Sequence, residues 1–286
     1  ASLVAALAGS ALAQTPAWTS EHADQTRAIV AEMLADAATR TSLLADGATA
    51  GHDGKFFLAS PDGKFRLNAS GQAQFRYTAS FLNDDPVVNV DDFDPGFEAP
   101  RTKLRFDGHI FEPSLFYAVQ MNFDEDTGTA RLEDAYVGYA WDNGFALIWG
   151  QLKMPVLWED VLHEKYSLAA DQSVVNAILN PGRSQGIWAH YSSDDWRMWL
   201  GFDDGITTAN TAFNSAGEPD WAITTRWEWK IAGQWSQFDQ FTSPRGSEFG
   251  AKLAAATHWQ NGPDVVGVPA ALVGAYTADF MLKGDG

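Results

Sequence analysis

Three cationic side chains occur at every second residue near the middle of the chain: Arg101, Lys103 and Arg105. Because successive side chains of a β-strand point to opposite faces, a strand here would place all three charges on one face, roughly 7 Å apart. A row of this kind suits an anion that moves stepwise along a hydrated surface. The alternative is that these cations pair with carboxylates on the same surface and keep it wet. Carboxylates suited to that pairing are Asp107, Glu133 and Glu228.

The same alternation predicts which other cations share the polar side of a strand. Lys153 is ambiguous, because Phe145, Leu147 and Trp149 have its parity and a pattern that is apolar on both sides does not fix the register. We keep it as a candidate for the polar face. The remaining candidates are Arg66, Arg76, Arg226, Lys230 and Lys252.

β-Strands are the elements that would position these residues. From residue 64 to residue 81, every even position is polar and every odd position is apolar or small, which is the period of a strand with two different faces. An ordinary strand has roughly 5–6 residues, and a tilted strand crosses a bilayer with about 9–11. The run therefore predicts a strand that could span a membrane and project beyond it.

Further strand-like runs follow, separated by residues typical of turns and loops. Two turns are predicted from composition, at Glu112-Pro113-Ser114 and, more strongly, at Asp142-Asn143-Gly144. Tight turns alternate with longer loops along the chain. The predicted strands cover residues 101–111, 115–123, 131–141, 145–154, 183–191, 196–203, 221–230, 247–259 and 271–282.

These features together predict an all-β fold, an antiparallel transmembrane β-barrel that is apolar outside and polar inside. Long strands, aromatic residues near strand ends and alternating turn and loop lengths are typical of outer-membrane barrels. A soluble β-sandwich would also alternate, but its strands would be shorter and its polar face would meet water around the outside. The barrel is the better interpretation.

Composition excludes several other classes of protein. The 286 residues carry a formal net charge of −18 and contain no cysteine, which excludes disulfide scaffolds and cysteine-based catalysis. A pI of about 4.5 argues against a nucleic-acid partner, which needs a basic surface. Mean hydropathy is −0.22, and no apolar run of about 18 residues is present to form a membrane helix.

The two ends of the sequence give three further expectations. Residues 1–13 end in Ala11-Leu12-Ala13, the pattern of a cleaved signal peptide, and predict export. Residues 14–54 predict a helical, coiled-coil-like segment, with Val30 and Leu34 in a heptad-like seam, followed by a linker; residues 55–286 would form the partial barrel. The last four residues have the composition of a turn, from which we expect a C-terminal truncation with further strands beyond it.

Three segments carry a family likeness: RTKLRFDGHIFEPSLFYAVQMNF (101–123), LEDAYVGYAWDNGFALIWGQLKMP (132–155) and SVVNAILNPGRSQGIWAHY (173–191). They resemble the phosphate-selective porin O and P family. The elements Gly150-Gln151-Leu152-Lys153-Met154-Pro155 and Asn180-Pro181-Gly182-Arg183-Ser184-Gln185-Gly186 are its most recognisable pieces. The resemblance implies a homotrimer of sixteen-stranded barrels in the bacterial outer membrane, in contact with lipid.

A porin's chemistry is electrostatic filtering, so the expected function is passive diffusion of small charged solutes, anions such as phosphate included. No cofactor, metal or catalytic residue is implied. The long segment 156–177 would either fold inward and narrow the pore or remain an external loop. If it folds inward, the candidates for a constriction are His163, Glu164, Lys165 and Asp171.

Two other functions compete with the porin interpretation. A secreted all-β carbohydrate-binding protein or glycosidase would gather its Trp residues on one concave platform, whereas a barrel would place them outward. A non-conducting surface barrel would look alike in sequence and differ only in conductance. Enzyme motifs are weak, because His163-Glu164 lacks a second histidine at the spacing of a zinc site.

Overall fold

The computed structural model describes residues 28, 30–32, 49–81, 93–167, 169, 171–213, 215, 218–262 and 271–285. The chain divides into two units, Ala1–Thr49 and Ala50–Gly286. In the first unit, residue 28 and residues 30–32 are helical. The expected signal peptide and most of the expected helical segment lie outside the described residues.

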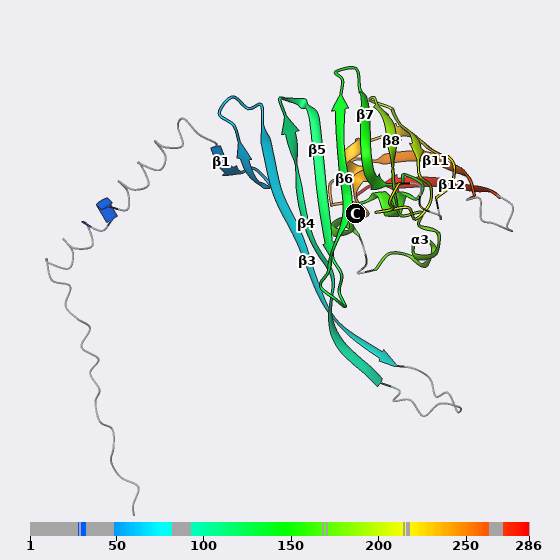
Figure 1. Cartoon of the computed structure of the whole chain (residues 1–286), viewed down its shortest axis with the longest axis horizontal. Helices are drawn as coiled ribbons and strands as arrows, with labels where there is room; N and C mark the ends of the chain where they lie inside the picture. The colour runs from blue at the N-terminus through cyan, green and yellow to red at the C-terminus, as the bar shows by residue number, and fades with distance from the viewer. Residues whose placement is uncertain are drawn as a thin grey trace, which may run out of the picture. The chain divides into compact units, whose positions relative to one another are not determined.

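Twelve strands of the described chain form one sheet, in which every strand lies beside its neighbours in sequence (Figure 1). Pairing is antiparallel from β2 to β12. The strands are β1 Thr49–His52, β2 Phe56–Ala59, β3 Arg66–Phe81, β4 Phe93–Ile110, β5 Glu112–Phe123, β6 Ala130–Ala140, β7 Phe145–Lys153, β8 Arg183–Ser192, β9 Trp196–Asp203, β10 Ala222–Ala232, β11 Gly250–Asn261 and β12 Leu272–Lys283.

The all-β prediction is confirmed, and the predicted runs overlap strands β3 to β12. Strand β4 begins at Phe93, eight residues before the predicted start at residue 101. The long alternating run became β3, of 16 residues, and its partner β4 has 18. Figure 1 shows these two strands continuing together past the ends of their neighbours. Within the described residues the sheet is open, with β1 and β12 at its two ends, so it is consistent with a porin barrel without being closed.

Two predictions about connections were wrong. The turn lies at Phe111, which has a φ of 65°, and Glu112 and Pro113 already belong to β5. Proline is tolerated there because pairing of β5 with β6 begins only at Leu115, so its missing N–H removes no hydrogen bond to β6. Thr49–His52 was expected to be linker but pairs as β1 at the end of the sheet.

Connections at the two ends of the strands differ in length. At one end, β4 and β5, β6 and β7, and β8 and β9 are joined by tight turns, whereas segments 154–182 and 204–221 join strands at the other end. The expected alternation fails at residues 233–249, a long connection at the tight-turn end. This segment includes the short helix η2 (Trp235–Asp239).

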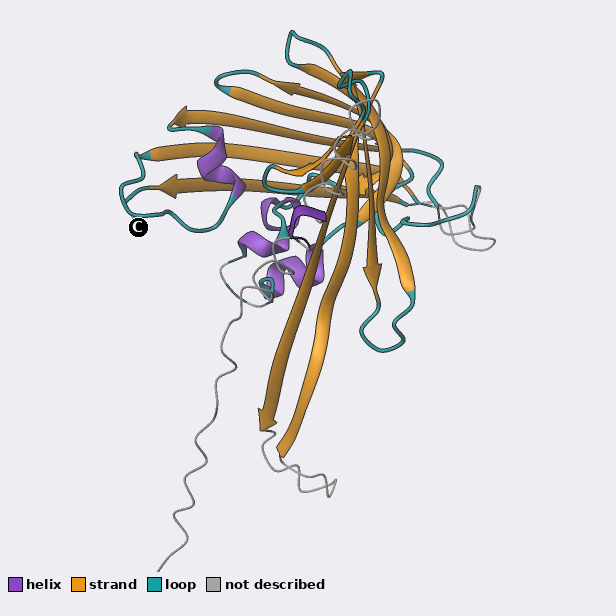
Figure 2. Ribbon diagram, turned by 90° about the vertical axis from the view of Figure 1, so that its left-hand side faces the viewer, coloured by secondary structure: helices purple, strands orange, loops and turns teal. Residues whose placement is uncertain are grey.

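Segment 154–182 contains three short helices, α2 (Trp158–Val161), η1 (Glu164–Tyr166) and α3 (Val174–Leu179). They lie against one face of the sheet (Figure 2). The contact is apolar at its base, where Met154 and Val156 pack on Ile148 of β7 and Trp188 of β8. None of the described helices is long and apolar enough to cross a bilayer.

Along β7, the strand faces exchange at Gly150. Trp149 is 68% exposed on the apolar face, yet Lys153, which has the same parity, contacts Asp160 on the polar face. Gly150 lies between them with a φ of 136°, a conformation that side chains with a Cβ rarely adopt. This backbone irregularity resolves the ambiguity of Lys153 in favour of the polar face.

We predict that Gly150→Ala impairs folding. A Cβ at residue 150 would lie 2.2 Å from the carbonyl oxygen of Ala135, and the backbone conformation would be strained as well, a cost of about 1–3 kcal/mol. The refolded fraction, measured by heat-modifiable gel mobility, should fall. Gly96→Ala is the matched control, because no atom lies within 4 Å of its added Cβ. Equal refolding of the two variants would contradict the role that we assign to Gly150 in β7.

Candidate functional site

The register of β3, β4 and β5 gathers polar side chains on one face, which we call the polar face. Arg101, Lys103 and Arg105 of β4 lie opposite Gln74, Gln72 and Ser70 of β3. On the other side, Lys103 and Arg105 lie opposite Asn122 and Gln120 of β5. The three cations thus share one face at alternate positions.

Each cation of this row has a polar or charged partner. Lys103 donates to Glu164 at 2.8 Å and lies 3.1 Å from Glu133. Arg105 lies 3.4 Å from both Asp107 and Asp134.

Arg105 also donates to the Tyr136 hydroxyl at 3.1 Å, and Arg101 donates to Gln74 at 2.8 Å and lies 3.7 Å from Asp171. The sequence left two alternatives for these cations, a bare cationic row or a paired one. The contacts favour pairing, because carboxylates reach Arg101, Lys103 and Arg105 alike.

Arg183 extends the same network and was missed as a site residue. It donates to Asp134 at 2.7 Å and lies 3.2 Å from Glu133, so that cations from β4 and β8 share the two acidic residues of β6. The available signal was its place in the family-like element 180–186, which marked the segment without assigning the side chain a role.

A second ion network occupies β10 to β12. Arg226 pairs with Glu228 at 2.9 Å and with Asp279 at 2.8 Å, and Lys252 donates to Glu228 at 2.7 Å. Arg226 and Lys252 are each only 2% exposed. Lys230 differs from them because it donates to the carbonyl oxygen of Gly233, at 3.0 Å.

Two candidate cations lie toward the β1 side of the sheet. Arg66 pairs with Asp53 at 2.6 Å and lies 4.3 Å from the ring centroid of Phe57. Arg76 pairs with Glu98 at 2.6 Å and with Asp171 at 2.7 Å. Because Asp171 belongs to segment 154–182, Arg76 links that segment to β3.

Segment 154–182 is bound to the polar face by charge as well as by apolar packing. Glu164 and Asp171 reach cations of β3 and β4, while Lys153 of β7 lies 3.6 Å from Asp160 and 3.9 Å from Glu164. The carbonyl oxygen of Val156 accepts from Thr277 of β12 at 2.7 Å. The segment therefore extends over the polar face from β3 to β12.

The other two constriction candidates, His163 and Lys165, make contacts within segment 154–182 itself. His163 accepts from the backbone N–H of Lys165 through Nδ1 at 3.5 Å. The Lys165 ammonium lies 4.8 Å from the ring centroid of Tyr166. Their side chains are thus engaged within the segment itself.

Burial and neighbouring charges shift three pKa values in this segment. Burial raises the pKa of Asp160 despite the nearby Lys153. Burial also lowers the pKa of His163, and the Lys165 charge adds to that effect. For Glu164, burial acts upward, but Lys103 and Lys153 outweigh it and hold the pKa below its ordinary value of 4.5. Glu164 is therefore the carboxylate whose charge is most clearly stabilised by docking.

Segment 233–249 also lies on the polar face, where it meets segment 154–182. Trp158 donates through Nε1 to the carbonyl oxygen of Phe238 at 3.2 Å, and its ring lies 4.6 Å from that of Phe241. Lys283 of β12 donates to the carbonyl oxygens of Gln240 and Phe241. Sequence reasoning missed this second segment; the available signal was an aromatic residue at every third position, 235, 238 and 241, in a connection at the tight-turn end.

Aromatic residues gather on the opposite face of the sheet, which we call the apolar face. Trp227 is 52% exposed there, the Trp196 and Trp229 rings stack at 5.7 Å, and Trp259 packs on Tyr276 at 5.0 Å. A carbohydrate-binding protein would have concentrated its Trp residues on one platform. The Trp residues of this face are instead spread over β7, β9, β10 and β11, as in the aromatic belt of a membrane barrel. Trp158, Trp188 and Trp199 lie on the polar face.

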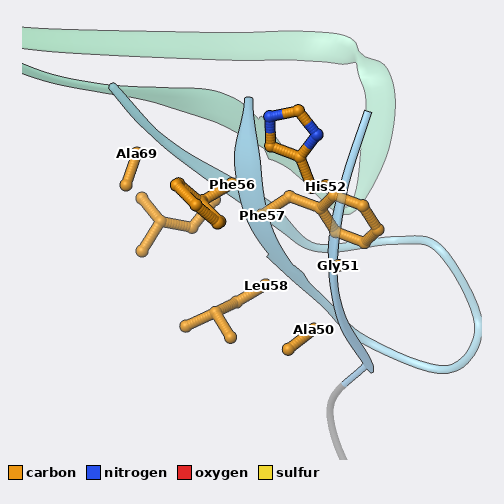
Figure 3. A pocket seen from close by; sticks show the side chains of 8 residues that line it. Ala50, Gly51, His52, Phe56, Phe57, Leu58 and Ala69 are labelled. Carbon is orange, nitrogen blue, oxygen red and sulfur yellow. The ribbon is translucent and has the colours of Figure 1, made fainter. Parts of the chain in front are cut away.

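A hollow beside β1 and β2 offers no chemistry of this kind (Figure 3). It is lined by apolar residues and one histidine, namely Ala50, Gly51, His52, Phe56, Phe57, Leu58, Leu67 and Ala69. Among the described residues, no group of three or more histidine, aspartate or glutamate side chains is arranged to hold a metal ion. The candidate site is therefore the charged polar face and its two covering segments.

The sheet has long antiparallel strands, one charged face, one aromatic face and a segment folded onto the charged face. These features are typical of outer-membrane porins. The model of the phosphate-selective porin O and P family matches residues 72–229, more than half of the chain, and the chain belongs to that family. This confirms the resemblance seen in the sequence. No curated protein matches the chain.

We predict that Lys103→Met loosens segment 154–182. The substitution removes the ammonium group that joins Glu164 of the segment to the polar face and leaves Glu164 with the more distant Lys153, at 3.9 Å. Breaking a buried pair in this way costs up to about 3 kcal/mol. The chain contains no cysteine, so Ser167→Cys provides a single reporter, and its maleimide labelling should become faster. Arg131→Met is the control, because Arg131 lies 3.7 Å from Asp124 at the edge of an exposed turn. Equal labelling rates in the Lys103→Met and Arg131→Met variants would contradict the role of Lys103 in holding the segment on the polar face.

Docking of the segment should also weaken in acid. Because the folded-state pKa of Glu164 lies below 4.5, its contribution is fully present above pH 4.5 and is lost as the pH falls through that lower value. Labelling of the Ser167→Cys reporter should therefore accelerate in pre-incubations below pH 4. Glu164→Gln should label fast already at pH 7 and lose this acid dependence. If Glu164→Gln still labelled faster in acid, the acid dependence would come from a group other than Glu164.

Proposed function

We propose that this chain forms the wall of a water-filled outer-membrane channel through which small charged solutes diffuse passively, inorganic anions such as phosphate among them. The observation that carries the proposal is the polar face itself. Its paired cations from β3, β4, β7, β8, β10 and β11 are accompanied by an inward segment that binds both β3 and β12. A face so rich in charge needs water beside it, and lipid can be met only by the aromatic face.

In this channel, the residues predicted from the sequence have different roles. Arg66, Arg76, Arg101, Lys103, Arg105, Lys153, Arg226, Lys230 and Lys252 line the pore, together with Arg183. Glu164 and Asp171 fasten the constriction, while His163 and Lys165 belong to its inner rim. The apolar face contacts outer-membrane lipid, the chain assembles as a homotrimer after cleavage of a signal peptide, and no cofactor or catalysis is involved.

Ion pairing between the lining cations and nearby carboxylates should limit the selectivity that we propose. Carboxylates within about 3 Å of Lys103, Arg183 and Arg226 cancel much of each cation's field, and salt screens the rest beyond about 8 Å at physiological ionic strength. The channel should therefore prefer anions only modestly. The domain organisation we propose is a signal peptide at 1–13, followed by a helical and linker segment, with the start of the barrel moved from the predicted residue 55 to β1, Thr49–His52.

We predict discrete conductance steps when the refolded full-length gene product enters a planar bilayer under a KCl gradient. The sign of the reversal potential should indicate a modest preference for chloride. Arg105→Gln should move that potential toward potassium, because Asp107 and Asp134 would lose a common partner. Trp227→Leu on the apolar face is the control and should leave it unchanged.

Three results would contradict the proposal in different ways. Inserted protein without conductance would indicate a non-conducting surface barrel. Protein that remains soluble and never inserts would overturn the membrane assignment and favour the carbohydrate-binding alternative. Cation preference in the wild type would transfer control of selectivity from the row on β4 to acidic loops such as Asp124-Glu125-Asp126.

A further inference from the structure

A cavity of about 300 Å³ lies where the two covering segments meet the polar face. Its walls come from segments 154–182 and 233–249 and from strands β8 to β11. Its lining includes Trp158, His190, Arg197, Trp199, Phe238 and Lys252. Because elements from both ends of the strands build it, the cavity exists only when both segments are docked.

Four rings line this cavity, which is unusual for a polar surface. The His190 and Trp199 rings lie 4.2 Å apart. The Lys252 ammonium lies 5.8 Å from the ring centroids of both Trp158 and Phe238. Aromatic walls favour a flat ring as occupant, because stacked or edge-to-face ring pairs add to the burial of apolar area. A cavity of roughly 150 Å³ already accommodates benzene, so the size suffices for one substituted ring.

Charge around the cavity is positive by one unit. Glu228 and Asp239 already accept from cations, at 2.7 Å from Lys252 and 3.1 Å from Arg197. Lys283 adds a charge 5.9 Å from the Trp158 ring and donates to two backbone carbonyls. The four cations are Arg197, Arg226, Lys252 and Lys283, and the three carboxylates are Glu228, Asp239 and Asp279.

We propose that this cavity is a binding site for a small aromatic carboxylate in transit through the channel, an inference that rests on the proposed function. The ring would lie against Trp158 and Phe238, and the carboxylate would face Lys252 and Arg197. A neutral sugar would gain nothing from the excess charge. Inorganic phosphate would gain nothing from the rings, so the site distinguishes organic from inorganic anions.

Calorimetric titration of the folded full-length protein in detergent tests this site with sodium benzoate as the probe. We expect saturable binding with a Kd on the order of 1 mM, as suits a ligand of so few atoms. Cyclohexanecarboxylate, glucose and inorganic phosphate should each bind at least about tenfold more weakly. This comparison uses the wild-type chain alone, so it stands even if variants fail to fold.

Two variants locate the site. Lys252→Met and Trp158→Leu should each weaken benzoate binding about tenfold, since one loses a charge-assisted contact and the other a ring contact. Lys252→Met leaves Glu228 with Arg226 as its partner. Trp227→Leu, on the apolar face, is the matched control and should bind benzoate as the wild type does.

The outcomes separate this inference from the channel proposal. Equal binding of benzoate and cyclohexanecarboxylate, tighter binding of phosphate or glucose, or full benzoate affinity in both folded variants would each overturn the site. Conductance in KCl without benzoate binding would overturn this inference alone. Benzoate binding by protein that never conducts would support the site and overturn the channel.

Discussion

The need to give every buried charge a partner governs how this sheet can be covered. Lys103, Arg226 and Lys252 are almost wholly removed from solvent, and an isolated buried ion would cost several kcal/mol. Docking of the segment that contains Glu164 covers Lys103 and supplies the carboxylate that this buried ammonium needs, and Glu228 and Asp279 flank the enclosed Arg226 in the same way. Strand register and loop docking are therefore linked, because a slip of one residue would carry these charges to the apolar face.

Covering the polar face from both ends of the strands follows from the same constraint. Segment 154–182 contributes acidic side chains to cations of β3 and β4, while segment 233–249 offers backbone carbonyls to Lys230 and Lys283. The aromatic residues Trp158 and Phe241 then join the two segments where charge has been satisfied. Ion pairs thus offset the cost of burying the charges, and apolar contact between Trp158 and Phe241 then holds the two segments together.

Much of the sheet could be predicted because a two-residue period is a local property of the chain. Strand β9 was predicted with its observed bounds, and the row on β4 was assigned to one face by parity alone. The face of Lys153 could not be predicted, because it depends on the backbone at Gly150. Pairing of Lys103 with Glu164 joins residues 61 positions apart and could not be predicted from a local pattern. The aromatic repeat at 235, 238 and 241 marks segment 233–249, but its docking depends on contacts with the distant β12.

The distinction between paired and carbonyl-bound cations bears on how such a surface could discriminate among solutes. A cation with a carboxylate at 3 Å acts toward a distant ion as a dipole, whose field falls faster with distance than that of a charge and is screened within about one Debye length. Lys230 and Lys283, which donate to backbone carbonyls, keep more of their monopole field. Both belong to strands beside segment 233–249. Discrimination by charge at that segment should therefore add to that of the row on β4, where the cations are more numerous but paired with carboxylates.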